Sequence, residues 1–380
     1  MPPIPLTKPY LAIDKNASAI DWSTQGHLCG DGPFSRRAES LLMGRTQSKY
    51  AFVTGSCTQA LELSVLSLGL CAGDEVILPS FTFISTATSL VRAGVTPVFV
   101  DICEDTLNID PESIAGAITP RTKAIMIMHY GGVACDMTAI SSIARKNQLF
   151  VIEDAAHSID AYVDKKHLGT LGDVGCFSFH ETKNVTCGEG GAFLTNNEDV
   201  AERAQLIRHK GTDRVRFLQG AISRYSWQEV GGNFLLAEPL ASLLLPQLEN
   251  LDFITSSRLR IFESYMEGLI DAAKLGYFRL PIVPAGCQPN GHIFYLLFPD
   301  EERRIRVEAE MKRKGIGATF HYQPLHSSPY MKRRSEEIPN LPVTDSISKR
   351  LLRLPIYPSL ESEEVQYIVE ALNLTVKELG

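Results

Sequence analysis

The sequence lacks the features that mark several classes of protein. No apolar run reaches the roughly 20 residues that a transmembrane helix needs. The eight cysteines contain no C-x-x-C pair, so they form neither a zinc pattern nor a disulfide framework. The N-terminal stretch MPPIPLTKPYLAID has neither the basic segment nor the apolar segment of a signal peptide. These absences predict a cytoplasmic protein without a membrane segment or a bound metal.

An excess of basic residues is also absent, because the formal net charge is −7. A nucleic-acid partner normally requires a basic face, so this class of ligand is disfavoured. An anionic small molecule stays possible, since a local basic pocket can exist within an acidic total. The chain has 380 residues, of which 44% are hydrophobic and 21% charged. Such a chain is globular and long enough for one large domain and a smaller one.

Short apolar runs alternate with longer amphipathic ones from about residue 50 onward. Several runs, such as AIMIM and LFVI, are apolar throughout, which is typical of strands covered by helices on both faces. Helical spacing in LELSVLSLGL and MTAISSIARKN separates them. The pattern therefore predicts an α/β fold with a mostly parallel sheet. Its expected strands are Tyr50–Val53, Glu75–Leu78, Thr96–Asp101, Ala124–His129, Leu149–Glu153, Asp173–Ser178 and Gly191–Thr195.

The pattern changes after residue 246. A long amphipathic stretch, an apolar strand HIFYLLF and a final helix with one apolar face predict a smaller α+β domain over 247–380, after a large domain over 1–246. Pro246 interrupts a helical run, so a kink or break is expected there. Charge, Pro and Asn cluster in KRRSEEIPNLPVTDS, residues 332–346, which predicts an exposed loop.

Two turns after strands carry residues suited to an anionic ligand. In VTGSCTQALELS a strand ends and a helix begins, so free N–H groups and the helix dipole favour a phosphate; an ordinary N-cap by Ser56 or Thr58 is the alternative. In FVIEDAAHSIDA, Asp154 ends a buried strand, at the edge where open α/β sheets bind ligands. That aspartate could equally be a helix N-cap.

A third turn contains Lys183, in the stretch CFSFHETKNVTCGEGGAFL. A lysine in a polar loop is usually a solvated charge, but a desolvated lysine attacks carbonyl carbons. Pyridoxal phosphate needs N–H donors for its phosphate, a carboxylate for its pyridine nitrogen and a lysine for its aldehyde. The combination of Lys183 with Asp154, Ser178 and the phosphate turn meets all three needs.

The motifs SCTQALEL, PSFTFISTA, EDAAH, GCFSFHETKN and GEGGAFLT, in this order, resemble the DegT/StrS-type nucleotide-sugar aminotransferases. The resemblance covers nearly the whole chain and implies the fold-type I architecture of pyridoxal phosphate enzymes. Within the family, LCGDGPFSRR, HYGGVACDM and RHKGTDR are similar to the transaminases that form TDP-4-amino-4,6-dideoxygalactose for cell-surface polysaccharides.

The resemblance also implies roles for residues around the cofactor ring. Lys183 would hold the cofactor covalently and, once displaced, move protons. Asp154 would keep the pyridine nitrogen protonated. Phe83 would stack on the ring, and His157 would lie near its phenolic oxygen.

Further residues are implied to hold the cofactor phosphate. Ser178 and the turn at Cys57 and Thr58 would bind it within one subunit, and Asn233 would reach the cofactor of the neighbouring subunit in a homodimer. Cys57 stands where many relatives have glycine. Backbone donors do not depend on that side chain unless φ is positive.

Substrate contacts are expected elsewhere in the chain. The stretch FHYQPLHSSPY, with Tyr322 and His326, resembles a family segment near the substrate cleft. A basic cluster at residues 208–210, ending in Lys210, could face a diphosphate, or could be a solvated surface. Tyr130 and the glycines after it could leave room for a sugar.

The predicted reaction moves an amino group, with L-glutamate as the expected donor, to the 4-keto carbon of a TDP-4-keto-6-deoxyhexose. Another nucleotide ketosugar, UDP- or GDP-linked or attacked at C3, is the alternative. Sugar dehydratases of the same fold carry His in place of the lysine, so Lys183 disfavours them. A non-catalytic regulator would not need both Lys183 and Asp154.

Overall fold

The computed structural model describes residues 2–12, 27–334 and 337–379. Its centre is a seven-stranded sheet with the order β1-β9-β8-β5-β4-β2-β3. The neighbours from β8 to β3 pair in parallel, whereas β9 is antiparallel to both β8 and β1. All seven predicted strands are confirmed: β1 Tyr50–Thr54, β2 Glu75–Pro79, β3 Thr96–Val100, β4 Thr122–Met128, β5 Phe150–Asp154, β8 Val174–Ser178 and β9 Gly191–Thr195.

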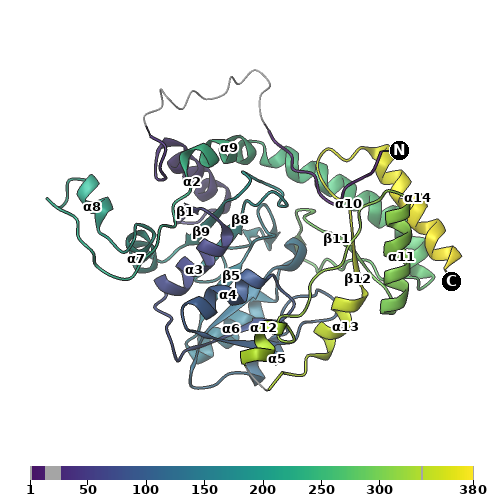
Figure 1. The fold of residues 1–380 in the computed structure, drawn as a ribbon, viewed down its shortest axis with the longest axis horizontal. Coiled ribbons are helices and arrows are strands. Elements are labelled where there is room, and N and C mark those ends of the chain that lie inside the picture. The colour runs from purple at the N-terminus through teal and green to yellow at the C-terminus, as the bar shows by residue number, and fades with distance from the viewer. Residues whose placement is uncertain (1, 13–26, 335–336, 380) are drawn as a thin grey trace.

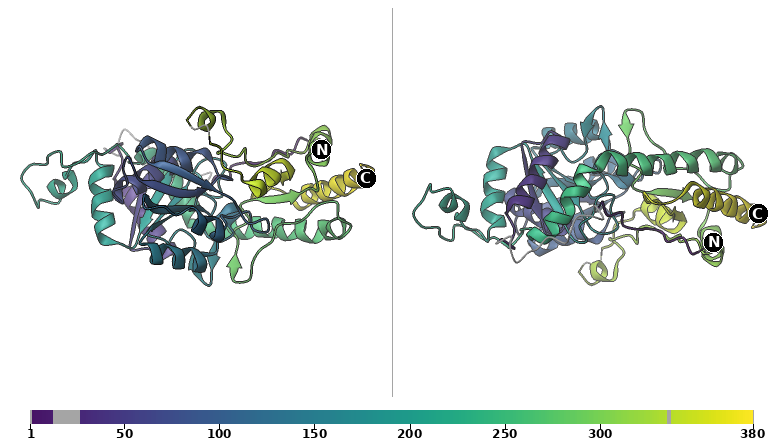
Figure 2. Two further views of the ribbon diagram at one scale, coloured as in Figure 1. Left: turned by 90° about the horizontal axis from the view of Figure 1, so that it is seen from below. Right: turned by 90° about the horizontal axis from the view of Figure 1, so that it is seen from above.

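Helices cover both faces of this sheet (Figures 1 and 2). Consecutive residues of a strand point to opposite faces, so Met126 of β4 packs with one set of helices and Ile125 and Ile127 with the other. This double burial explains the unbroken apolar runs. One face carries α3 Cys57–Ser67, α4 Ile84–Arg92 and α7 Glu198–Arg208; the other carries α2 Pro33–Thr46, α5 Pro111–Gly116, α6 Met137–Asn147 and α9 Glu238–Glu249.

A second hydrophobic core lies beside the sheet and is built mostly from residues after 246. The expected final helix is α14, Ser362–Glu378, which buries Val365, Ile368 and Leu372 in this core. The division into two domains at residue 246 stays a prediction. The other elements after residue 250 are α10 Leu251–Lys274, β11 Phe294–Leu297, α11 Glu301–Arg313, α12 Pro329–Arg334, α13 Pro342–Arg350 and β12 Leu351–Leu354.

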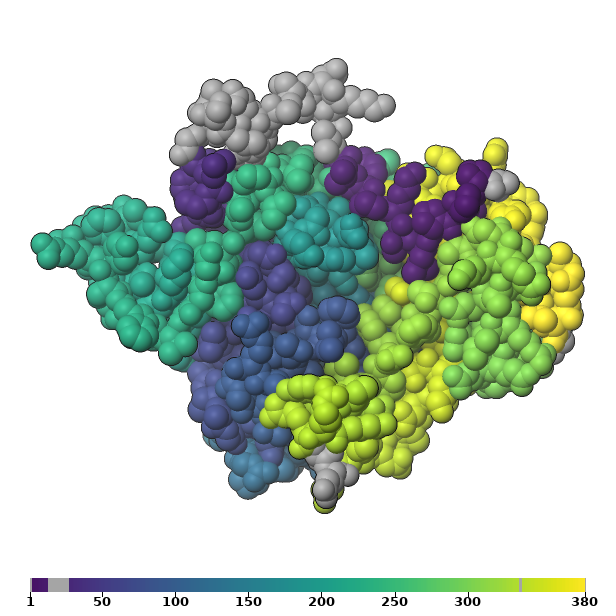
Figure 3. Space-filling view, viewed as in Figure 1, coloured from purple at the N-terminus to yellow at the C-terminus, as the bar shows by residue number. Residues whose placement is uncertain are grey.

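The N-terminal segment crosses from this second core toward the sheet (Figure 3). The N–H of Ile4 donates to Gly315 at 2.8 Å, and the N–H of Gly317 donates to the carbonyl of Ile4 at 2.7 Å. Smaller elements complete the chain: the turn η1 Tyr130–Gly132, the helix α8 Arg214–Leu218 and a three-stranded sheet of β6 Tyr162–Val163, β7 Lys166–His167 and β10 Cys287–Gln288.

Two local predictions need correction. Helix α9 continues through Pro246 to Glu249, and the helical run breaks at Asn250 instead, directly before α10. The stretch 332–346 is not one exposed loop, because α12 ends in it and α13 begins in it, although residues 335 and 336 lie outside the described part. Pro342 occupies the first turn of α13, where a missing N–H is tolerated, and Asp101 accepts hydrogen bonds from the N–H groups of Val343 and Thr344.

Candidate active site

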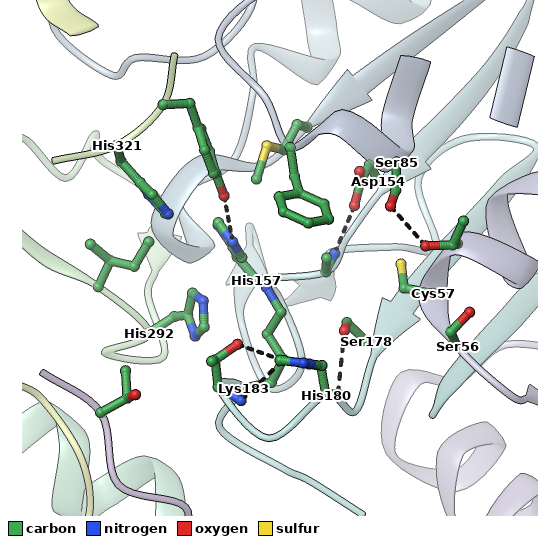
Figure 4. A pocket seen from close by; sticks show the side chains of 18 of the residues that line it. Ser56, Cys57, Ser85, Asp154, His157, Ser178, His180, Lys183, His292 and His321 are labelled. Carbon is green, nitrogen blue, oxygen red and sulfur yellow. Dashed lines mark hydrogen bonds between the residues drawn. The ribbon is translucent and has the colours of Figure 1, made fainter. Parts of the chain in front are cut away.

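A cavity of about 630 Å³ opens where the carboxyl ends of β5 and β8 meet the start of α3 and the second core. In Figure 4, Ser56 and Cys57 lie on one side of it and His292 and His321 on the opposite side. We call the first group, Ser56, Cys57, Thr58, Asp154, Ser178 and Lys183, the strand-end wall. We call the second, His157, His292, His321 and Tyr322, the ring wall.

Lys183 reaches the cavity from the loop between β8 and β9. The loop is fixed by backbone hydrogen bonds, among them that from Lys183 to His180 at 2.9 Å and that from Phe179 to Gly190 at 2.8 Å. Burial lowers the pKa of the Lys183 amine from 10.5 to about 8, against the opposing effects of Cys57 and Asp154. An appreciable share of this amine is therefore neutral near neutral pH, which a nucleophile requires.

Asp154 is the last residue of β5 and only 2% exposed. Its carboxylate accepts hydrogen bonds from the Thr86 hydroxyl at 2.7 Å and the Ala156 N–H at 3.2 Å. Burial raises its pKa, while these two hydrogen bonds and the charge of Lys183 act in the opposite direction. A buried carboxylate held in this way is suited to a cationic partner.

The turn that was predicted to bind a phosphate lies at the start of α3. Ser56 is the N-cap, and its hydroxyl accepts from the N–H of Gln59 at 3.2 Å. The N–H groups of the first helical turn have no acceptor within the helix and are available to an anion. The N-cap alternative and the phosphate site are thus compatible here, since the cap leaves the N–H groups of Cys57 and Thr58 for a ligand.

The cysteine at the turn does not disturb it. Cys57 begins α3 and has no positive φ, and its sulfur faces the carbonyl of Cys176 at 3.8 Å. Gly191 is needed instead: a Cβ there would lie 2.4 Å from the Cys57 nitrogen. Thus β9 can begin beside the helix start only with glycine at this position.

The strand-end wall fits pyridoxal phosphate on these observations. The helix start and the Ser178 hydroxyl would hold the phosphate, Asp154 the pyridine nitrogen, and Lys183 the aldehyde carbon. The distance between the two strand ends is fixed by the pairing of β5 with β8. Among the residues that the structure describes, no group of His, Cys, Asp and Glu side chains is arranged to hold a metal ion. None of the described helices is long and apolar enough to cross a membrane.

The ring wall consists of uncharged rings in contact. His157 accepts from the Gly131 N–H at Nδ1, so its Nε2 carries the proton and donates to the Tyr322 hydroxyl at 3.3 Å. His321 stacks on Tyr322 with ring centroids 3.7 Å apart. Burial lowers the pKa of His157, His292 and His321, so these imidazoles are neutral at pH 7.

Two further aromatic residues were expected near the site. Tyr130 is buried behind the ring wall, where its hydroxyl meets His321 Nδ1 at 3.1 Å. Phe83 lines the cavity at its exposed rim and lies 6.4 Å from the Tyr322 ring. Tyr130 therefore acts on a ligand only through its neighbours, whereas Phe83 can touch one directly.

Besides Tyr130, three predicted residues lie outside this cavity. Lys210 and Asn233 line a separate surface pocket of about 240 Å³, where the lysine amine donates to the Asn233 amide oxygen at 3.2 Å. His326 is buried, and its Nδ1 meets the Ser80 hydroxyl at 2.6 Å. Within one chain, none of these side chains faces Lys183.

The expected basic cluster at residues 208–210 needs correction at its first two members. Arg208 is 1% exposed and is ion-paired with Glu39 and Asp31. His209 is also buried, 3.4 Å from a carboxylate oxygen of Asp31. Both side chains are thus buried against carboxylates of the same chain, and of the three residues only Lys210 is accessible to a diphosphate.

The structure adds residues that the sequence did not single out. Thr86 binds Asp154, and His292, His321 and Arg353 line the cavity. A signal existed for Arg353, because it is the one charged residue in the apolar stretch LLRLPIYP. His321 lies within the FHYQP motif, but only its neighbour Tyr322 was predicted there as a substrate contact.

Comparisons with known proteins agree with this geometry. The model of the family described as the DegT/DnrJ/EryC1/StrS aminotransferase family matches residues 12–373. The spore coat polysaccharide biosynthesis protein SpsC of Bacillus subtilis (strain 168) is 33% identical over 383 residues, covering 98% of this chain and 97% of SpsC.

Solved structures give the same result. The aminotransferase TlmJ from Streptoalloteichus hindustanus superposes with a TM-score of 0.90 at 28% identity, over 99% of each chain. DesV from S. venezuelae, crystallised in complex with a ketimine intermediate, superposes with a TM-score of 0.85 at 31% identity, over 93% of this chain and 91% of DesV.

Proposed function

The chain belongs to the DegT/DnrJ/EryC1/StrS aminotransferase family, and on that premise we propose that it aminates the 4-keto carbon of a TDP-4-keto-6-deoxyhexose. Members of this family are sugar aminotransferases that depend on pyridoxal phosphate. L-Glutamate would be the donor, with 2-oxoglutarate and TDP-4-amino-4,6-dideoxygalactose as products. The observation that carries the reaction class is the presence of the Lys183 amine and the Asp154 carboxylate in one cavity.

Pyridoxal phosphate, when bound, supplies the electron sink that makes a proton on the neighbouring carbon acidic. The neutral amine of Lys183 takes that proton from the α-carbon of the donor and later delivers a proton to C4 of the sugar. Asp154 stabilises a positive charge at the pyridine nitrogen, and Thr86 fixes the orientation of its carboxylate. Asp154 ends β5, and the loop of Lys183 begins after Ser178 at the end of the neighbouring strand β8, so the pairing of these strands keeps both groups at one edge of the sheet.

The remaining cofactor contacts are part of the same proposal. The N–H groups of Cys57 and Thr58 and the hydroxyl of Ser178 bind the phosphate. His157 lies near the phenolic oxygen, and Phe83 covers the ring from the exposed rim. Tyr322 then contacts the sugar beside His157, and Tyr130 supports it from behind.

A homodimer is proposed from residues outside the cavity. The segment around α8 projects from the body of the protein (Figures 1 and 2). It exposes Leu218, Tyr225 and Trp227, which are 62%, 51% and 77% accessible. Exposed apolar side chains in one region are typical of a protein interface. In a dimer, Lys210 and Asn233 beside this segment would complete the partner's site.

The identity of the sugar rests on the motifs LCGDGPFSRR, HYGGVACDM and RHKGTDR. The name of SpsC connects a relative to polysaccharide synthesis, which supports a role in cell-surface polysaccharide formation. A role for His326 with the substrate and a cytoplasmic location stay predictions.

The test is to supply TDP-4-keto-6-deoxyglucose and L-glutamate to the purified protein and to analyse the products by mass spectrometry and NMR. We expect a TDP sugar with an axial amine at C4. UDP- and GDP-linked ketosugars are assayed in parallel as alternative substrates. Amination of one of these alone, or at C3, would replace the proposed substrate and leave the reaction class intact.

A further inference from the structure

Arg353 is a cation without a partner at the edge of the cavity. It belongs to β12, lies opposite Tyr295 of β11, and its N–H donates to Thr319 at 2.8 Å. Its side chain lines the cavity. Among the described residues, no carboxylate lies within ion-pair distance of its guanidinium, and its buried Nε has no hydrogen-bond partner.

Other buried arginines of the chain are paired. Arg208 contacts two carboxylates, and Arg258 donates to the carbonyls of Gly291 and His292 at 3.0 and 2.9 Å. An unpaired charge that is largely removed from water is unfavourable. Its presence beside a cavity therefore indicates a site that is completed by an anion.

The surroundings of Arg353 locate that anion on the side of the ring wall. The backbone bridge between Arg353 and Thr319 places Arg353 beside the segment that continues into His321 and Tyr322. In agreement with this geometry, burial and then the charge of Arg353 lower the pKa of His321. The same charge also acts on Lys183. Since the histidines of the ring wall are neutral, Arg353 provides a fixed positive charge beside that wall, and the carboxylate of Asp154 lies on the strand-end wall.

We propose that the Arg353 guanidinium binds the α-carboxylate of the amino donor, an inference that rests on the proposed aminotransferase function. In an α-amino acid the carboxylate is attached to the carbon whose proton Lys183 removes. It must therefore lie close to Lys183. The planar fork of arginine matches a carboxylate through two parallel hydrogen bonds.

The sugar diphosphate is the other anion that could use this cation. It is attached to C1, so the pyranose ring separates it from the reacting C4. The diphosphate is therefore kept away from Lys183, whereas Arg353 lies on a strand bridged to the segment that contains His321 and Tyr322 and lines the same cavity as Lys183. The donor carboxylate is consequently the better match.

The experiment compares Arg353→Gln and Arg353→Lys with wild-type protein loaded with pyridoxal phosphate. Single-turnover absorbance changes are recorded with L-glutamate, L-glutamine, L-aspartate and L-alanine, and TDP binding is measured by calorimetry. The matched control is Arg279→Gln, which removes an arginine whose exposed ion pair is with Glu104. The visible spectrum of bound cofactor before mixing shows whether the variant site is intact.

We expect Arg353→Gln to lower the second-order rate with the best donor on the order of 100-fold, with the cofactor spectrum and TDP affinity unchanged. Arg353→Lys should recover part of the loss, because charge is kept and the fork is lost. An unchanged donor rate, or a loss of TDP affinity as large as the loss of donor rate, would overturn the inference. If wild-type protein responds to no amino donor, the proposed function itself fails and the inference falls with it.

Discussion

The two walls of the cavity hold their side chains by different means. In the strand-end wall, Asp154 is the last residue of β5, and Lys183 lies in the loop after β8, which main-chain hydrogen bonds fix. In the ring wall, His157, His321 and Tyr322 are fixed by contacts among side chains from distant parts of the chain. The first wall is rigid because the sheet is rigid, whereas the second depends on how the second core packs against it.

This difference assigns different tasks to the two walls. A cofactor that stays bound through every cycle needs fixed contacts, and the sheet edge provides them. Donor and sugar must enter and leave in turn, and neutral rings with one unpaired guanidinium can accept both without a fixed charge partner. We therefore expect substitutions in the strand-end wall to abolish chemistry and those in the ring wall to alter substrate use.

The largest effect is expected for Lys183→Ala. Without this amine neither proton transfer has a base, so turnover should fall at least roughly 10⁴-fold. The visible absorbance of the purified protein should change as the covalent attachment is lost. Lys166→Ala, at an exposed position of β7, should keep both spectrum and rate. Full activity of Lys183→Ala would refute the assignment of the reaction class.

Asp154→Asn tests the charge at the same wall. Loss of one electrostatic partner of the reacting centre should lower kcat by roughly 10²- to 10³-fold. Because burial raises the pKa of Asp154, the cofactor-free variant should be no less stable than wild type at pH 7 in chemical denaturation. Asp136→Asn, at the N-cap of α6, serves as the control. A variant that retains wild-type kcat would show that the carboxylate does not face the pyridine nitrogen.

The pH dependence of cofactor binding follows from Lys183. Its pKa is lowered to about 8, and only the neutral amine attacks an aldehyde. Since the neutral fraction rises about tenfold per pH unit below the pKa, the rate of pyridoxal phosphate attachment to cofactor-free protein should rise in this way up to about pH 8 and then level off. Stopped-flow absorbance measures it. A rate that keeps rising to pH 10 would indicate an ordinary solvated lysine.

The smallest effect is expected for Tyr322→Phe in the ring wall. The change removes the hydroxyl that accepts from His157 at 3.3 Å, a contact worth about 1 kcal/mol. We expect kcat/KM for the sugar to fall about fivefold, with no change in the cofactor spectrum. Tyr330→Phe on α12 is the exposed control. A spectral change as large as that of Lys183→Ala would remove the distinction between the walls.

The same contrast explains what the sequence could predict. Strands such as β4 were recognisable because both faces are buried. Asp154 was recognisable because it ends such a strand, and Lys183 because it lies in the polar turn after another. The residues of the ring wall come from positions 157, 292 and 321–322, and their proximity depends on tertiary packing that no local pattern encodes. Arg353 has the same origin, since its place in the cavity follows from the pairing of β12 with β11.

The effects of two prolines on secondary structure were not predictable from the local sequence. Pro246 was expected to interrupt a helix and Pro342 to belong to a loop, yet one lies within α9 and the other starts α13. A proline inside a helix costs roughly 3 kcal/mol, which the packing of Leu244 and Leu245 beside it must offset. Whether a helix continues through a proline therefore depends on how the neighbouring side chains are buried.

The N-terminal segment carries a practical consequence for producing the protein. Ile4 is anchored between Gly315 and Gly317, and the next residues, Leu6 and Thr7, line the cavity. An affinity tag joined just before Ile4 would be tethered within a few residues of the cavity lining, and removing residues 4–7 would remove part of that lining. Helix α14 ends at the exposed residue Glu378, which lines none of the four cavities described for this chain. A purification tag or an immobilisation site is therefore better placed after α14, where it does not contact the lining of these cavities.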